Sequence, residues 1–317
     1  MLTTTKWKGV NLFSGIGGMI YGLRKYVHPL ICNSRYQVEG DIIWRQMEQQ
    51  TLPHIFSLQM TELLIGSFTE TPDLVYAFLS NEYYLSHALV GEPLPLPDQG
   101  ALVNAIKLCV RVASQQEIMN ILLFCEGDLS LRSDYHVILR CFSLSGYTLR
   151  VTRVEIKADS PLLTSSNWIT VLEARFDLEL ISLSATPEFR VASLYLQLGS
   201  YKKQTWAMMN DENLLLRCSM MRWDISPILA EEIWNLLSCS QLGSLRITPE
   251  TELGYDVFHH ELNLLKYFPS KAYISTSEGE ETKEGTESYP FIQLDKTTKI
   301  NPCLYEMYTG FPMNWTA

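Results

Sequence analysis

The residues best suited to hold a small ligand lie near the start of the chain, in the glycine-rich stretch Asn11-Leu-Phe-Ser-Gly-Ile-Gly-Gly-Met19. An apolar run of strand character precedes this stretch and a helical pattern follows it. Glycine reaches positive φ and lets the backbone approach a ligand closely, and the first N–H groups of a helix are free to bind a carboxylate or a phosphate. The same residues would serve equally well as a tight strand-to-helix connection, so this stretch alone leaves both interpretations open.

Reactive side chains elsewhere lack partners at catalytic or metal-binding spacing. The seven cysteines are scattered and include no CxxC pair, which argues against a zinc knuckle or a disulfide framework. Cys125 lies in an apolar run, and we predict a core residue there rather than a nucleophile. No metal site is expected. Four histidines have no acid partner at a motif-like spacing and are interpreted as structural or surface residues: His87, His136, His259 and His260.

The elements that must position these residues form an α/β pattern. From Lys8 to about Ala192, β-rich apolar runs alternate with segments of helical spacing, which is typical of a mainly parallel sheet flanked by helices. After about Ser193 the alternation fades. The expected strands are Trp7–Phe13, Tyr36–Glu39, Leu74–Phe78, Ile121–Cys125, Thr148–Ile156 and Trp168–Phe176, and the expected helices are Met19–Tyr26, Ile43–Gln50, Gly100–Ser114 and Asp134–Leu144.

The composition is that of a folded protein with an acidic balance. Apolar residues make up 46% of the 317 residues and charged residues 19%. A formal net charge of −10 argues against a broad phosphate-binding surface, although it leaves room for a local basic face. No apolar run reaches the roughly 18 residues of a membrane helix, and the first residues lack the apolar core of a secretory signal. We therefore expect a cytoplasmic protein with no membrane partner.

The glycine-rich stretch resembles the first motif of the cytosine-5 DNA methyltransferases, Asp-Leu-Phe-(Ala/Ser)-Gly-Ile-Gly-Gly, and departs from it only at Asn11. In that family the motif holds the methionine part of S-adenosylmethionine. The resemblance also implies that Glu39, predicted at the end of the second strand, accepts hydrogen bonds from the ribose hydroxyls. The residues implied for cofactor binding are Phe13, Ser14, Gly15, Ile16, Gly17, Gly18 and Glu39.

The next matching stretch, Thr71-Pro-Asp-Leu-Val-Tyr-Ala-Phe, resembles the strand that leads into the family's Gly-(Phe/Pro)-Pro-Cys-Gln active-site loop. The family's cysteine adds to carbon 6 of a flipped cytosine and so makes carbon 5 reactive toward the methyl group. Here the loop reads Leu79-Ser-Asn-Glu-Tyr83, and Ser80 or Asn81 falls at the place of the cysteine. A serine hydroxyl without an adjacent base is hardly ionised near neutral pH, so methylation by the family mechanism should be absent.

Two further active-site motifs are altered. The run Ile121-Leu-Leu-Phe-Cys-Glu126 resembles the family's strand ending in Glu-Asn-Val, whose glutamate hydrogen-bonds the cytosine ring. Glu126 is kept, while Asn-Val is replaced by Gly127-Asp128; an acid that merely caps a loop remains the alternative. The family's Gln-x-Arg-x-Arg, which braces the active site and contacts DNA, has lost both arginines, and in its place stand Thr164, Ser166 and Trp168.

The closing segment, Asn301 to Thr316, resembles that of small phage and bacterial cytosine methyltransferases, which carry Asn-Pro, Glu, Met-Gly-(Phe/Trp)-Pro and Trp-Thr in this order. The final Gln-Ile-Gly-Asn-Ala motif is missing. The resemblance implies a Rossmann-like S-adenosylmethionine-dependent methyltransferase fold with a smaller target-recognition-like lobe. It divides the chain into a methyltransferase-like domain (1–192), a variable target-recognition-like region (193–298) and a segment that packs back on the first domain (299–317).

Three functions remain compatible with these residues. The first is a non-catalytic pseudo-methyltransferase, a binding or regulatory protein that retains S-adenosylmethionine, DNA or an active methyltransferase subunit as a partner. The second is an active DNA methyltransferase that uses a variant mechanism or a second subunit. The third is an interaction scaffold, which the net charge of −10 and the acidic stretch Ser277–Ser288 favour.

Overall fold

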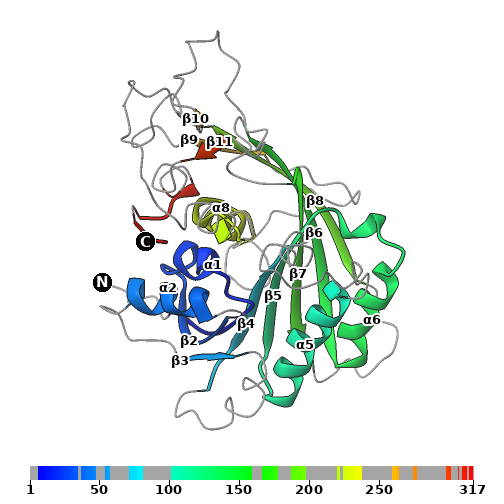
Figure 1. The fold of residues 1–317 in the computed structure, drawn as a ribbon. Coiled ribbons are helices and arrows are strands. Elements are labelled where there is room, and N and C mark those ends of the chain that lie inside the picture. The colour runs from blue at the N-terminus through cyan, green and yellow to red at the C-terminus, as the bar shows by residue number, and fades with distance from the viewer. Residues whose placement is uncertain are drawn as a thin grey trace, which may run out of the picture.

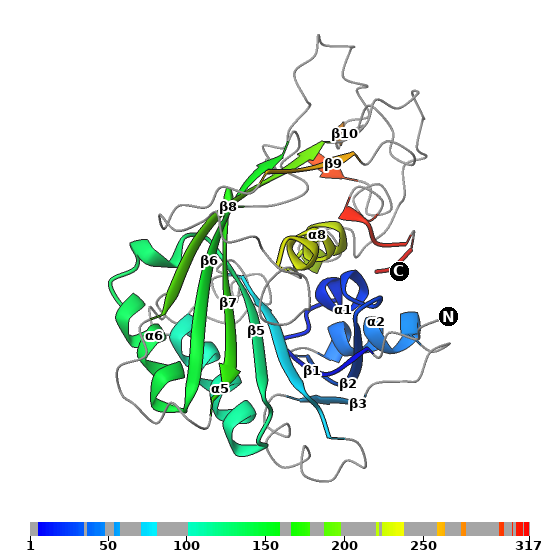
Figure 2. The ribbon, with the colours of Figure 1, turned by 180° about the vertical axis from the view of Figure 1, so that it is seen from behind.

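A computed structural model gives the fold of the protein, and Figures 1 and 2 show it from two opposite sides. The predicted loop Gly91–Gly100, the acidic stretch Ser277–Ser288 and Asn81 lie outside the described residues. Within the part of the chain that is described, no helix is long and apolar enough to cross a membrane. The structure describes residues 6–34, 37–47, 54–57, 71–80, 101–158, 166–177, 187–197, 220–221, 224–237, 259–263, 274–276, 298–300, 306, 309–312 and 314–316.

Nine described strands form one twisted sheet in the order β3-β2-β1-β4-β5-β7-β6-β8-β9 (Figure 1). Only β7 in this sheet runs antiparallel to its neighbours. Helices cover both faces of the sheet, so the predicted Rossmann-like methyltransferase fold is confirmed. The strands are β1 (Trp7–Leu12), β2 (Val27–Ser34), β3 (His54–Ser57), β4 (Leu74–Leu79), β5 (Asn120–Glu126), β6 (Tyr147–Ala158), β7 (Trp168–Phe176), β8 (Glu188–Gln197) and β9 (His259–Asn263), with a separate pair β10 (Ile274–Thr276) and β11 (Thr298–Ile300).

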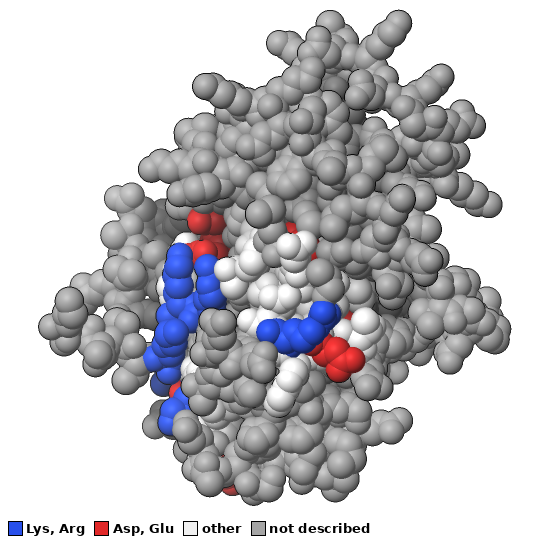
Figure 3. Space-filling model, turned by 60° about the vertical axis from the view of Figure 1, so that its left-hand side comes forward, with Lys and Arg blue, Asp and Glu red and all other residues white. Residues whose placement is uncertain are grey.

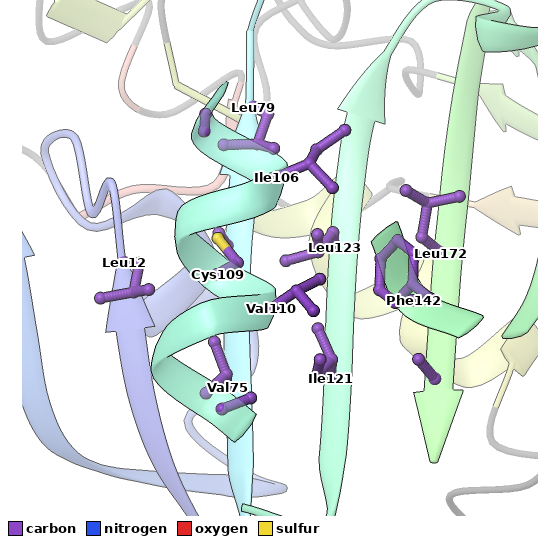
Figure 4. Packing of buried hydrophobic residues seen from close by; sticks show 14 of the residues in the cluster. Leu12, Val75, Leu79, Ile106, Cys109, Val110, Ile121, Leu123, Phe142 and Leu172 are labelled. Carbon is purple, nitrogen blue, oxygen red and sulfur yellow. The ribbon is translucent and has the colours of Figure 1, made fainter. Parts of the chain in front are cut away.

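The central strand β5 is buried along its whole length, as expected for a strand with helices on both of its faces. Its side chains alternate between two apolar clusters. Ile121 and Leu123 face helices α5 (Ala101–Gln115) and α6 (Tyr135–Leu144), as Figure 4 shows. Leu122 and Phe124 belong to the cluster on the opposite face, which includes α8 (Pro227–Leu237). The continuous apolar run of β5 therefore reflects two cores rather than one.

The predicted second strand, Tyr36–Glu39, is wrong. The strand lies earlier in the chain, as β2, and Glu39 lies in the first turn of helix α2 (Gln37–Met47). A proline within β2 argues against a strand in the sequence, because proline has no N–H to donate a hydrogen bond to a neighbouring strand. Pro29 is tolerated because the pairing of β1 with β2 skips a residue there, with Gly9 opposite Pro29 and Val10 opposite Ile31.

Helix α8 lies in the region where the sequence showed no regular pattern. It packs against the short helix α1 (Gly18–Gly22). Just after α1, Lys25 forms an ion pair with Glu231 of α8, which lies 206 residues later in the chain. Its start is well defined, because the Ser226 hydroxyl accepts a hydrogen bond from the N–H of Leu229 at 3.1 Å and Pro227 occupies the first helical position. The division of the chain at residue 192 stays a prediction; β8 spans that position.

Substituting Gly22 should weaken the contact between α1 and α8. A Cβ at Gly22 would lie 2.5 Å from the carbonyl oxygen of Pro227 and 2.9 Å from the Cβ of Ala230, so one helix must move. Gly22→Ala should lower the free energy of unfolding in urea by about 1–3 kcal/mol, although alanine favours the helix itself. The control Lys107→Ala, on the exposed face of α5, should change it by less than about 0.5 kcal/mol. Equal stability of Gly22→Ala and the control would contradict this packing.

Candidate functional site

The glycine-rich stretch forms a tight turn between β1 and α1, at the carboxyl end of a central parallel strand. Positive φ occurs at Phe13 (55°), Gly15 (53°) and Gly17 (95°), and such values are unusual for any residue but glycine. The turn is tied to the end of β2, since the N–H of Ser14 donates to the carbonyl oxygen of Asn33 at 2.8 Å and the Ser14 hydroxyl accepts from the N–H of Asn33 at 3.1 Å. The predicted arrangement of a strand, a glycine-rich turn and a helix is confirmed, and it lies at the kind of sheet end where ligands of open parallel sheets bind.

A carboxylate of the chain itself lies in this turn. Asp224, just before α8, accepts a hydrogen bond from the N–H of Gly18 at 2.8 Å, and its other oxygen accepts from the N–H of Ile225 at 2.8 Å. A Cβ on Gly15 would lie 2.8 Å from the Asp224 carboxylate, and one on Gly18 would lie 2.0 Å from the carbonyl oxygen of Ile225. The glycines therefore make room for the chain's own segment.

This arrangement decides how well the turn fits S-adenosylmethionine. The motif would hold the methionine part of the cofactor, whose carboxylate needs a free backbone N–H and space beside the glycines. Asp224 takes the N–H of Gly18 and fills the space over Gly15 and Gly18. In this conformation the turn does not fit the cofactor's carboxylate, and we derive no chemistry from it.

Glu39 lies close to the same turn, although not where the sequence placed it. Its side chain is buried, with 1% of its area exposed, and its negative charge acts on Asp224. The pKa of Asp224 is raised to about 7, mainly by burial and also by the charge of Glu39, while hydrogen bonds from the N–H groups of Gly18, Ile225 and Ile16 act to lower it. Binding of a ribose by Glu39 stays a prediction. The expected position of Glu39 at the end of the second strand is wrong, because the residue lies in the first turn of α2.

The closing segment covers the turn from another side. The indole N–H of Trp315 donates to the carbonyl oxygen of Ile16 at 2.8 Å, and a Cβ on Gly17 would lie 3.5 Å from the Trp315 ring. Glu306 holds the segment together, because its carboxylate accepts from the N–H of Thr316 at 2.8 Å and from its hydroxyl at 2.6 Å. Residues from both ends of the chain thus enclose the glycine-rich turn.

The predicted catalytic position and the retained acid meet at the ends of β4 and β5. The Ser80 hydroxyl donates to the carboxylate of Glu126 at 2.6 Å, and both side chains are buried. The pairing follows from the sheet, because Leu79 lies opposite Cys125 in the parallel register and the next residues are therefore neighbours. These are the two residues for which the sequence resemblance implied contact with a target base, and here they are bonded to each other.

The replacement of Asn-Val by Gly127-Asp128 has a structural reason. Gly127 has φ of 91°, and the Asp128 carboxylate caps the short 3-10 turn Leu129–Leu131 by accepting from the N–H of Ser130 at 3.0 Å. Asp128 also pairs with Arg153 of β6, whose guanidinium lies 5.1 Å from the centre of the Trp168 ring. Trp168, in the place of a lost family arginine, thus lies beside an arginine from the adjacent strand.

Three of the four described cysteines lie in the core, and the fourth, Cys141, is half-buried on α6 with a pKa that burial raises. Cys32, Cys109 and Cys125 are fully buried, and burial raises the pKa of each thiol. The prediction of Cys125 as a core residue is confirmed, since its side chain points toward α5. Among the described residues, no group of three or more His, Cys, Asp and Glu side chains could hold a metal ion.

Comparisons with known proteins were made for the whole chain. No protein-family model and no curated protein sequence matches it. Solved structures do match, among them a mutant DNMT2 from Spodoptera frugiperda, at 12% identity and a TM-score of 0.40 over 59% of this chain and 55% of that one. A putative DNA modification methyltransferase from an E. coli prophage matches at 12% identity and a TM-score of 0.39, over 56% and 49%.

The matches extend to methyltransferases of other kinds. Magnesium protoporphyrin IX methyltransferase from Synechocystis, solved with bound SAM, matches at 11% identity and a TM-score of 0.33, over 54% of this chain and 71% of that one. The chain spans only about half the length of the two structures named first. Likenesses this distant decide nothing about what the chain does, and the fold class rests on the sheet itself.

The Ser80–Glu126 hydrogen bond should contribute measurably to stability. Ser80→Ala leaves a buried carboxylate oxygen without this donor, so we expect the free energy of unfolding to fall by about 1–3 kcal/mol. A double-mutant cycle with Glu126→Gln isolates the pair, and the coupling should be about 0.5–3 kcal/mol. A coupling of zero by urea denaturation would mean that the two groups do not interact in solution.

Replacing Asp224 with Asn should remove a pH-dependent destabilisation. The pKa of Asp224 is raised to about 7 in the folded protein, above the ordinary aspartate value of about 3.9, so the folded state keeps a proton that the unfolded state has lost and the group's contribution to stability falls between about pH 4 and pH 7. Asp224→Asn lacks this slope, and its stability relative to the parent protein should rise by on the order of 2 kcal/mol from pH 5 to pH 8.

The control for that experiment is Asp134→Asn. A hydrogen bond from Arg132 lowers the pKa of Asp134, so this carboxyl titrates below the tested window. Its stability difference from the parent protein should be the same at pH 5 and pH 8. If urea denaturation gives Asp224→Asn the same flat difference, the Asp224 carboxylate is not held as described.

Proposed function

We propose that the protein is a catalytically degenerate homologue of the cytosine-5 DNA methyltransferases that acts as a binding or regulatory protein. The observation that carries the proposal is the hydrogen bond from Ser80 to Glu126, where the family needs a thiolate and a carboxylate that both face the base. A serine hydroxyl is a poor nucleophile near neutral pH, and Cys32, Cys109 and Cys125 are fully buried with raised pKa values.

The cofactor site supports the same proposal. The residues implied for S-adenosylmethionine are all present, but the turn they form contacts Asp224 and Trp315 of the chain itself. A bound cofactor would supply the methyl group in this family. The closed turn favours a protein that performs its role without methyl transfer, and it also favours the second candidate, an interaction scaffold on the methyltransferase fold.

DNA and a methyltransferase subunit are the partners that the proposal allows, and a cytoplasmic location goes with them. Figure 3 shows a narrow stripe of described Lys and Arg side chains on the face that it draws, with acidic side chains close to it. Lys6 and Lys25, near the ends of β1 and α1, are already engaged, with the carbonyl oxygen of Arg24 at 2.7 Å and the Glu231 carboxylate at 2.5 Å. Because affinity for DNA comes largely from cations that neutralise phosphates, the formal net charge of −10 makes a protein partner the stronger proposal.

The proposal predicts that the purified protein transfers no methyl group to DNA. Radiolabelled S-adenosylmethionine and unmethylated DNA should give no label above background, because Ser80 stands where the family's thiolate would attack carbon 6. Ser80→Cys tests whether the missing sulfur is the only defect. It should remain inactive as well, since the cofactor turn is closed and the two family arginines are absent.

An active cytosine-5 methyltransferase is the positive control in the same assay, and a lysate of the source organism is added in a parallel reaction to supply any second subunit. Label on DNA with the purified protein alone would overturn the proposal. Label that appears only with lysate, and only when this protein is present, would instead identify a subunit-dependent enzyme.

A further inference from the structure

We propose that Asp224 is an autoinhibitory latch, which keeps ligands that carry a carboxylate out of the glycine-rich turn. The inference rests on the proposed function in one respect, since it takes the turn to be the remnant of a cofactor site. It goes beyond that function by naming the residue that closes the site and the ligands it excludes.

The contact between the Asp224 segment and the glycine-rich turn depends on close packing as well as on hydrogen bonds. Asp224 accepts from the N–H of Gly18 at 2.8 Å, and the carbonyl oxygen of Ile225 approaches Gly18 so closely that any Cβ would overlap it. Ser226 then caps α8 through the N–H of Leu229, so the segment is fixed directly to a helix. Buried apolar side chains of that helix, including Leu229 and Ile233, hold it on the sheet.

Charge adds to the exclusion of a ligand carboxylate. Among the described residues, the groups that act on Asp224 are the negative charge of Glu39 from α2 and the N–H groups of Ile16 and Gly18 in the turn and of Ile225 before α8. The neighbouring Trp315 is neutral and uses its indole N–H for Ile16. A ligand carboxylate would enter beside two acids and would have to displace one of them from the N–H of Gly18.

The latch can be tested by calorimetric titration with S-adenosylhomocysteine, which has a carboxylate and transfers no methyl group. The parent protein should show no binding at millimolar ligand, and Asp224→Gly should bind at least about tenfold more tightly. Asp224→Asn keeps the shape and removes the charge, so its gain should be smaller. Glu231→Gln, which removes an acid from α8 away from the turn, should behave as the parent protein does.

A second ligand separates the latch from a general loosening of the protein. Methylthioadenosine lacks the amino-acid carboxylate, so its affinity should be the same for the parent protein and Asp224→Gly. Circular dichroism and thermal unfolding show whether each variant is folded; Asp224→Asn serves if Asp224→Gly is not.

Three outcomes would overturn the latch: equal S-adenosylhomocysteine affinity in the parent protein and both Asp224 variants, no binding by any folded variant, or an equal gain for methylthioadenosine. The proposed function is judged separately. Methyl transfer to DNA by Asp224→Gly would support the latch while overturning the non-catalytic function, whereas binding without transfer supports both.

Discussion

Gly18 is buried, and a buried backbone donor has to be paired. In a cofactor-binding turn a ligand would satisfy such a donor; here Asp224 does so, at 2.8 Å. Much of the arrangement around the turn depends on this bond, because it fixes the segment that leads into α8, and α8 with α1 covers one face of the sheet (Figure 2). The bond brings a carboxylate beside Glu39, and burial raises its pKa to about 7. That energetic cost is tolerated because the segment also buries a large apolar surface.

The need to pair a buried polar group also acts at the Ser80–Glu126 site. Glu126 ends a fully buried strand, and without a base to bind, its carboxylate needs donors from the protein. Ser80 supplies one of them from the neighbouring strand. A cysteine at this position would be a much weaker donor, so the serine suits a paired, non-reactive site better than a thiol would. Both sites are therefore hydrogen-bonded within the chain, which supports the proposed function.

Much of the central fold could be predicted from the sequence, because β4, β5 and α5 carry the continuous apolar runs and helical spacing of buried elements. The neighbouring positions of Ser80 and Glu126 come from the pairing of β4 with β5, which the structure shows. Other features could not be read in this way. β2 could not be predicted because it contains Pro29, and the irregular pairing that accommodates this proline is seen only in the structure. The start of α8 did have a local signal in the sequence, the pair Ser226-Pro227. The role of Asp224 depends on a contact across 206 residues, which no local pattern encodes.

The central claim is that the protein's own residues occupy both the place of the cofactor carboxylate and the partner of the retained acid. A crystal structure of the protein grown with millimolar S-adenosylmethionine tests it most directly. We predict that the Asp224 carboxylate remains on the N–H of Gly18, that Ser80 remains on Glu126, and that no ligand occupies the turn. A cofactor molecule whose carboxylate accepts from the N–H of Gly18, with Asp224 displaced, would contradict the account.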